Sequence, residues 1–139
     1  MKLSLFFFIA CYVPIIGFTQ TPNTEIVDFP EEPAQYYGGE SAMNEFISKN
    51  IIYPEIAIEM EISGKCFIGF TINENGVISD LKVIKGVDGC PECDVEAMRV
   101  INLMPIWMPA KNKGQAVKSK YIIPINYMIV GRKHGRKKK

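Results

Sequence analysis

The segment from Gly64 to Gly86 constrains the fold more than any other part of the sequence, because it has the pattern of a β-hairpin. Apolar residues recur in its first half with a period of two, as expected of a half-buried strand. The dipeptide Asn75-Gly76 comes next, and both residue types tolerate the positive φ that closes a tight turn. The residues expected on the buried face of the first strand are Cys66, Ile68, Phe70 and Ile72.

The pairing of the two arms depends on the turn. A two-residue turn sets Phe70 opposite Leu81 and Ile68 opposite Val83. A four-residue loop over 73–76 shifts the pairs but keeps their parity, so the same apolar residues stay on one face. A hairpin alone is only marginally stable in water, so other segments must cover that face.

Two helices are expected to provide this cover. The first begins at Ser41 as N-cap and ends near Asn50, and the second begins at Asp94 as N-cap and ends before Pro105. The second helix carries an apolar stripe, at helical spacing, that can lie on the hairpin. Its members are Ala97, Val100, Ile101 and Met104.

A shorter helical face is expected between these two helices. Pro54 pushes Tyr53 into an extended conformation and so separates the first helix from the residues after it. Over residues 55–62, Ile56, Ala57 and Met60 recur at helical spacing. We expect these three side chains to form one apolar face.

The last strand alternates from Tyr121 to Ile129 and has one wholly apolar face. Pro124 has no N–H, which places the strand most easily at a sheet edge with that side unpaired. Together with the hairpin, this predicts an α+β fold with a small antiparallel three-stranded sheet and two helices packed on one face. A free edge can dock an extended peptide by β-augmentation. Alternatively, the basic tail covers this edge, or a second copy of the chain covers it and gives a self-associating envelope protein or homodimer.

The two ends of the chain differ from this domain. Residues 132–139 form a basic tail that supplies 6 of the 16 Lys and Arg residues, so residues 1–131 carry 10 basic against 15 acidic side chains. Such tails are usually solvated, although contact with anionic lipid is a second interpretation. Residues 20–35 contain three prolines among acidic residues and predict an extended, poorly packed arm before a domain over 36–131.

The N-terminus predicts export. Residues 1–19 have the features of a cleaved signal peptide, with Lys2 before a 16-residue apolar run over 3–18 and a cut between Thr19 and Gln20. An uncleaved signal anchor formed by residues 3–18 is the alternative, and a lipoprotein processed at Cys11 is less favoured. On either main interpretation the domain is exported, which argues against a nucleic-acid partner.

The cysteines raise a possible chemical role. Cys90 and Cys93 precede a helix, and in an exported protein a local disulfide between them is the favoured interpretation. The alternative is a thiol–disulfide protein that uses this pair. Cys66 is expected to be a buried free thiol. We expect no enzyme, metal or cofactor, because His134, the one His, lies in the tail and no nucleophile–base pair emerges.

The order of several short motifs resembles the C-terminal domain of TonB, especially its Bacteroidetes-type form, over about residues 36–130. The ordered set is more specific than any single element. In this sequence the motifs are Tyr53-Pro54, Ala57, Gly64-Lys65, Asn75-Gly76-Val77-Ile78, Glu96-Ala97, the segment Met104-Pro105-x-Trp107-x-Pro109, and Gly114 before a final aliphatic strand.

This resemblance implies a non-enzymatic periplasmic module that binds the TonB box of outer-membrane TonB-dependent receptors by strand addition beside its last strand. An ExbB/ExbD-type inner-membrane complex would then supply force for uptake of siderophores, vitamins or glycans. Carried over to this sequence, the docking edge spans 118–130, with Tyr53 and Pro54 close to the docked segment. The partner-binding residues expected on this basis are Tyr53, Pro54, Lys118, Ser119, Lys120, Tyr121, Ile122, Ile123, Pro124, Ile125, Asn126 and Tyr127.

Two features depart from a full transducer of that family. Such a protein has an uncleaved membrane helix and a long Pro-rich linker, whereas residues 1–19 resemble a signal and the arm over 20–35 is short. At about 3.4 Å per residue, a stretched arm of this size reaches roughly 55 Å. The departures affect the expected force transmission more than the expected receptor binding.

Overall fold

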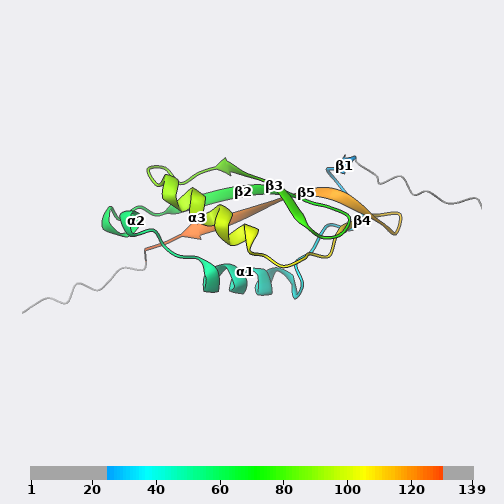
Figure 1. Ribbon diagram of the computed structural model, residues 1–139, viewed down its shortest axis with the longest axis horizontal. Helices are drawn as coiled ribbons and strands as arrows, with labels where there is room; N and C mark the ends of the chain where they lie inside the picture. The colour runs from blue at the N-terminus through cyan, green and yellow to red at the C-terminus, as the bar shows by residue number, and fades with distance from the viewer. Residues whose placement is uncertain (1–24, 130–139) are drawn as a thin grey trace, which may run out of the picture.

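The computed structural model describes residues 25–129, which form an α+β domain with helices on one face of a twisted sheet (Figure 1). None of the helices in this part of the chain could span a membrane. The signal over 1–19 and the basic tail over 132–139 lie outside the described residues. In chain order the elements are β1 (Ile26–Val27), α1 (Gly39–Asn50), α2 (Glu55–Glu59), β2 (Gly64–Ile72), β3 (Ile78–Lys85), α3 (Pro91–Asn102), β4 (Ala110–Asn112) and β5 (Gln115–Tyr127).

The sheet has the order β1-β5-β2-β3, and β4 also pairs with β5. The predicted fold class is confirmed, but the sheet has five strands in the described residues where the sequence predicted three. The two additional strands are the shortest, β1 and β4. Both lie against the first residues of β5, and neither has enough residues to show a periodic pattern in the sequence.

The hairpin between β2 and β3 has the predicted Ile68–Val83 pair. The predicted Phe70–Leu81 pair is wrong, because Gly69 pairs with Lys82 and Thr71 with Ser79, so two residues of β3 lie opposite Phe70 alone. This is a β-bulge, and Asp80 within it has a φ of +53°. The predicted pairing failed because one inserted residue leaves no trace in the alternation of β2.

The hairpin turn is closed by the Asn-Gly pair and its neighbours. The Asn73 side-chain oxygen accepts from the backbone N–H groups of Asn75 and Val77, both at 2.9 Å. Gly76 has a φ of +80°, and a Cβ there would lie 1.9 Å from the carbonyl oxygen of Trp107. The Gly76 carbonyl also accepts from the Trp107 N–H at 2.9 Å. The turn therefore requires glycine both for its conformation and for its contact with the tryptophan segment.

Both helix starts differ from the prediction. The N-cap of α1 is Gly38, with a φ of +87°, and not Ser41; the predicted end at Asn50 is confirmed. The N-cap of α3 is Cys90, whose sulfur accepts from the Cys93 N–H, and not Asp94. The Asp94 carboxylate instead accepts from the Val87 N–H at 2.9 Å and holds the loop before the helix. Pro91 at the helix start explains the earlier beginning, since proline is favoured there.

The core lies between the helices and the inner face of the sheet. From α3 the predicted stripe is buried at Ala97, Val100 and Ile101. The predicted apolar face of the short helix α2 is wrong in part: Ala57 is buried, but Ile56 and Met60 are exposed. With only five residues, α2 is too short to bury a full apolar stripe.

The arm predicted over residues 20–35 is extended, but its described part is packed rather than loose. Ile26 and Val27 pair with β5, and isolated bridges join Glu32 to Lys111 and Gln35 to Met108. Ala34, near the predicted start of the domain, is buried. These contacts join residues 73 to 92 positions apart, so local sequence patterns could not reveal them.

Candidate functional site

Strand β5 pairs with β1, β2 and β4, and its two sides differ. On one side it pairs with β2 without a register shift, from Gly64 opposite Tyr127 to Ile72 opposite Ser119. Its inward side chains are buried at Ile123, Ile125 and Tyr127, as the alternation predicted. From Ser119 to Tyr127, the backbone groups of β5 that face β2 are therefore already paired.

The other side of β5 is covered only at its beginning. There β1 pairs in parallel with Lys118 and Ser119, while β4 pairs with residues 115–117, beyond the end of the pairing with β2. The expected free edge must therefore be corrected at these two residues, which already have a partner strand. From residue 120 to residue 127, β5 pairs with no other strand of the described chain on this side.

Pro124 indicates which backbone groups face the unpaired side. Pairing with β2 runs through Pro124 without a break, although proline has no N–H to donate. Its nitrogen therefore faces away from β2. Because backbone groups alternate along a strand, the N–H groups of Lys120, Ile122 and Asn126 face the same free side. We call residues 120–127 on this side the free edge.

Helix α1 stands beside the second half of the free edge. A hollow of about 700 Å³ separates the helix from the strand. The Tyr53 ring packs edge-on against Tyr127 at 5.4 Å, and its hydroxyl donates to the Ile62 carbonyl at 2.6 Å. Burial raises the pKa of Tyr53. The lining residues are Asn44, Ile47, Ser48, Ile51, Tyr53, Pro124, Ile125, Asn126, Tyr127 and Met128.

A second hollow, of about 340 Å³, lies nearer the beginning of the free edge. It is bounded by residues 33–36, the first turn of α1 and the ring of Tyr121. Tyr121 stacks on Phe70 at 5.8 Å and meets Trp107 edge-on at 4.9 Å. Burial, followed by the charge of Glu40, raises the pKa of Tyr121. The aromatic cluster thus fixes the wall of this hollow.

Trp107 is a packing residue. It is wholly buried, and its ring also meets Tyr36 at 5.4 Å and Phe70 at 5.7 Å. Its backbone carries the contact with the Gly76 turn described above. The Asn-Gly and Pro-x-Trp-x-Pro motifs therefore belong to a single structural unit that supports the second hollow.

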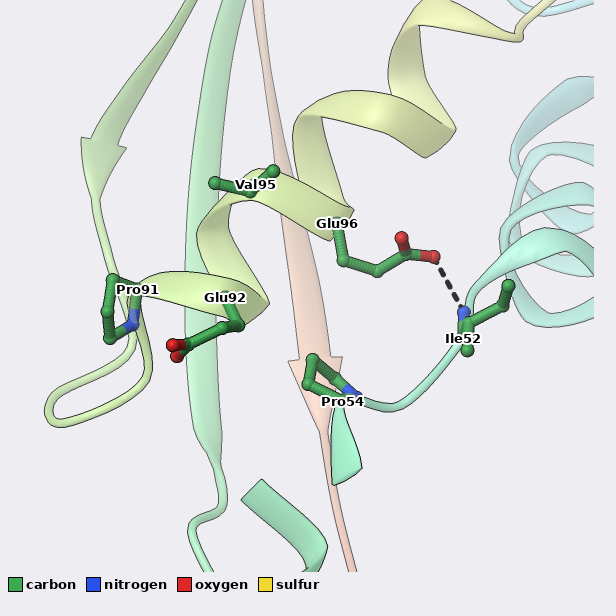
Figure 2. Close-up of a pocket in the computed structure, with 6 residues that line it drawn as sticks. All are labelled: Ile52, Pro54, Pro91, Glu92, Val95 and Glu96. Atoms are coloured by element: carbon green, nitrogen blue, oxygen red, sulfur yellow. Dashed lines mark hydrogen bonds between the residues drawn. The ribbon is translucent and has the colours of Figure 1, made fainter. Parts of the chain in front are cut away.

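Tyr53 and Pro54 point to different places, although the sequence predicted both near a docked segment. Pro54 lines a separate hollow of about 430 Å³ between the α1–α2 connection and α3, with Ile52 and Val95 (Figure 2). There the Glu96 carboxylate accepts from the Ile52 N–H at 2.7 Å. The free-edge hollows contain Tyr53 but not Pro54.

Glu96 and Arg99 hold the connection that carries Tyr53. The Arg99 guanidinium bonds the Glu96 carboxylate at 2.7 and 2.8 Å, and it donates to the Asn50 carbonyl at 2.8 Å. The hydrogen bond from Arg99, supported by that from Ile52, lowers the pKa of Glu96. This ion pair ties the end of α1 to α3 and so fixes one end of the larger hollow.

The cysteines are placed for structure rather than chemistry. Cys90 and Cys93 are joined by a disulfide and both are fully buried. Cys66 is a free, fully buried thiol, as predicted, and burial raises its pKa to about 12. A redox pair needs an accessible sulfur and a stabilised thiolate, so this site does not favour the thiol–disulfide interpretation.

Sequence reasoning missed the α1 wall and the residues of the arm. From the sequence, Ile47 was interpretable only as a core position of the first helix, and residues 33–35 only as part of a poorly packed arm. The polar residues Asn44 and Ser48 lie on the α1 surface that faces the free edge. No signal in a single sequence distinguishes them from ordinary solvent-facing residues.

Comparison with known proteins gives one family match, to the description "Gram-negative bacterial TonB protein C-terminal", over residues 49–129. Among solved structures, two solution structures of Helicobacter pylori TonB C-terminal domain fragments are similar. The shorter is 26% identical with a TM-score of 0.48, covering 66% of this chain and 95% of that one. The longer is 28% identical with a TM-score of 0.47, covering 65% and 79%.

A third similar structure is the Pseudomonas aeruginosa TonB C-terminal domain. It is 24% identical with a TM-score of 0.44, and the match covers 59% of this chain and 81% of that one. No curated protein matches this chain. The family match covers more than half of the 139 residues and includes α2, α3 and strands β2 to β5.

Proposed function

Because this chain belongs to the family of Gram-negative bacterial TonB C-terminal domains, we propose that it binds an extended segment of an outer-membrane receptor along the free edge of β5. Proteins of this family are envelope transport proteins and not enzymes. In this proposal the segment is the TonB box of a TonB-dependent receptor. The observation that carries the proposal is the run from residue 120 to residue 127, which has no strand partner beyond β2 in the described chain.

The wider role belongs to the same proposal. The domain would lie in the periplasm, and the contact would support energy-dependent uptake of siderophores, vitamins or glycans. A link to an ExbB/ExbD-type inner-membrane complex requires that the apolar residues 3–18 remain uncleaved as an anchor. A cleaved chain would bind receptors without transmitting force.

The physical basis of binding is backbone pairing. A docked strand would satisfy the outward N–H groups of the free edge and the carbonyls of the same residues. Each such hydrogen bond contributes about 0.5–1.5 kcal/mol net. Tyr53, which lines the adjoining hollow, would contact the docked side chains.

Titration of the ¹⁵N-labelled protein with a TonB-box peptide tests the proposal. We expect amide shifts along Lys120 to Tyr127 and around Tyr53, with little change along β3. The matched control is the same peptide with proline at alternate positions, which cannot donate to β5. An absence of shifts along the free edge at millimolar peptide would rule the proposal out.

A further inference from the structure

We propose that the free edge and its two hollows together select a peptide of about eight residues that carries large apolar side chains four positions apart. We call this space, bounded by β5, α1 and residues 33–36, the trough. The inference rests on the proposed function and specifies the chemistry of the segment that it would bind.

The peptide length is set by the two ends of the free edge. At its beginning, β1 already pairs with Lys118 and Ser119, and the Asp28 carboxylate lies 3.1 Å from the Lys120 ammonium. At its far end β5 stops at Tyr127. The unpaired backbone between these limits spans residues 120–127. An extended chain of about eight residues can pair with it, since opposed strands advance together at about 3.4 Å per residue.

The side-chain pattern is set by register. Residues directly opposite each other on neighbouring strands point to the same face of a sheet. Tyr121 and Ile125 both point toward the helices, and each lines one of the two hollows. Peptide residues opposite Tyr121 and Ile125 would therefore enter the hollows. These two positions are four residues apart in either strand direction, so the pattern does not depend on the orientation of the peptide.

The chemistry of the hollows favours apolar side chains. The larger hollow contains Ile47, Ile51 and the rings of Tyr53 and Tyr127, with Asn and Ser side chains at its margin. The smaller hollow contains Met43 and the ring of Tyr36. Among the described residues, Glu40 is the only charged one that lines either hollow, and it disfavours an acidic side chain nearby. Ile123 lines neither, so the position opposite it needs no large side chain.

A single peptide fits the trough better than a second copy of the protein. In each copy α1 stands beside the free edge, and its residues Asn44, Ile47 and Ser48 face the second half of that edge. Pairing two such edges would bring two helices and two copies of β1 into the same space. A lone extended chain brings its own backbone and no such neighbours.

Three host peptides of eight residues, rich in Thr, test the pattern. One carries Leu at positions 2 and 6, one carries Leu at positions 2 and 5, and one carries no Leu. Because alternate residues face opposite sides, the second peptide can place only one Leu in a hollow. Full burial of one Leu stabilises by about 1.5–3 kcal/mol, so the first peptide should bind at least tenfold more tightly than the second.

Two variants localise the effect to the larger hollow. Ser48→Trp places a large ring in it and should reduce the affinity of the first peptide to that of the second. Lys49→Trp is the matched control: this residue is the next on the same helix, is exposed and lines neither hollow, so the tenfold preference should persist. Circular dichroism of both variants confirms that they fold.

The outcomes separate this inference from the proposed function. If TonB-box peptides shift the free edge but the two Leu-bearing peptides bind equally, the pattern is wrong and the proposed function stands. If no peptide shifts the free edge, both are wrong. A concentration-dependent dimer whose interface protects residues 120–127 in the absence of peptide would overturn the single-peptide trough.

Discussion

The two outer sides of the sheet differ in how regular their strand pairing is. On the β3 side, the register with β2 shifts twice, at Phe67/Ile68 and at Gly69/Thr71, and Asp80 has a left-handed φ of +53°. On the β5 side, the register with β2 is unbroken over nine consecutive pairs. One edge is therefore irregular and the other is straight.

This difference indicates that only one edge is suited to pairing with another chain. Bulges and charged side chains on edge strands prevent unwanted association. Strand β3 has both, with Asp80, Lys82 and Lys85 among its eight residues. Strand β5 instead leaves a regular backbone beside two largely apolar hollows. The exposed edge that is left regular is the one that we propose binds a peptide.

The largest expected effect distinguishes the two sides of β5 itself. Ile123→Pro removes an N–H that faces β2 and should destabilise the fold by about 3 kcal/mol or more. Ile122→Pro removes an N–H that faces the free edge and should cost less than about 1 kcal/mol. Urea unfolding of the two variants measures the contrast. Equal destabilisation would mean that the free side is already paired.

The Ile122→Pro variant also tests whether the free edge pairs with a peptide. A docked peptide should lose one backbone hydrogen bond to Ile122→Pro, which lowers its affinity about twofold to tenfold. Fluorescence anisotropy with a labelled TonB-box peptide provides the measurement. Unchanged binding by the folded Ile122→Pro variant would show that this part of β5 makes no pairing contact.

Removing the bulge on β3 should make the two edges alike. Deletion of Asp80 leaves equal numbers of residues between the flanking pairs on β2 and β3, and the straightened edge should raise self-association over the parent chain. Asp80→Gly is the control, since it relieves the left-handed conformation but keeps the bulge. Sedimentation across a concentration series compares the two. A deletion variant that associates no more than Asp80→Gly would contradict the protective role of the bulge.

A smaller effect, on the pH dependence of stability, concerns Glu96, whose ion pair with Arg99 ties the end of α1 to α3. Because the pKa of Glu96 is lowered in the fold, its stabilisation is present above the unfolded-state value of about 4.3 and is lost as pH falls through the lower folded value. Glu96→Gln should cost about 1 kcal/mol at pH 7 and remove this part of the acid dependence. The control is Glu92→Gln, because Glu92 lines the Pro54 hollow together with Glu96. This variant should neither lower the stability at pH 7 nor change the acid dependence. Parallel pH profiles of Glu96→Gln and the parent would refute the assignment.

The sequence was most informative where one element carries its own pattern. Alternation placed the inward face of β5 correctly, with Ile123, Ile125 and Tyr127 buried. Helix starts were less predictable, because the sequence favoured the more usual N-cap residues Ser41 and Asp94. Instead, Gly38 caps α1 through its left-handed backbone conformation, and Cys90 caps α3 through its sulfur acceptor. Caps depend on the chain that leads into the helix, which local residue types do not determine.

The site was predictable only in part for the same reason. Pro124 alone suggested a free side on β5, and Tyr53 does line the adjoining hollow. The coverage of Lys118 and Ser119 by β1 and the wall formed by α1 depend on contacts between distant segments. A periodicity of two or 3.6 residues describes one element against an unspecified core and contains no information about which segment lies beside it.

Amide hydrogen exchange of β5 tests the central claim most directly. In the free protein the N–H groups of Ile122 and Asn126 should exchange rapidly, while those of Ile123 and Ile125, which face β2, should exchange slowly. Saturation with a TonB-box peptide should slow Ile122 and Asn126 by at least tenfold and leave the inner pair unchanged. Slow exchange of Ile122 and Asn126 before any peptide is added would show that the protein seals this edge itself and would contradict the account.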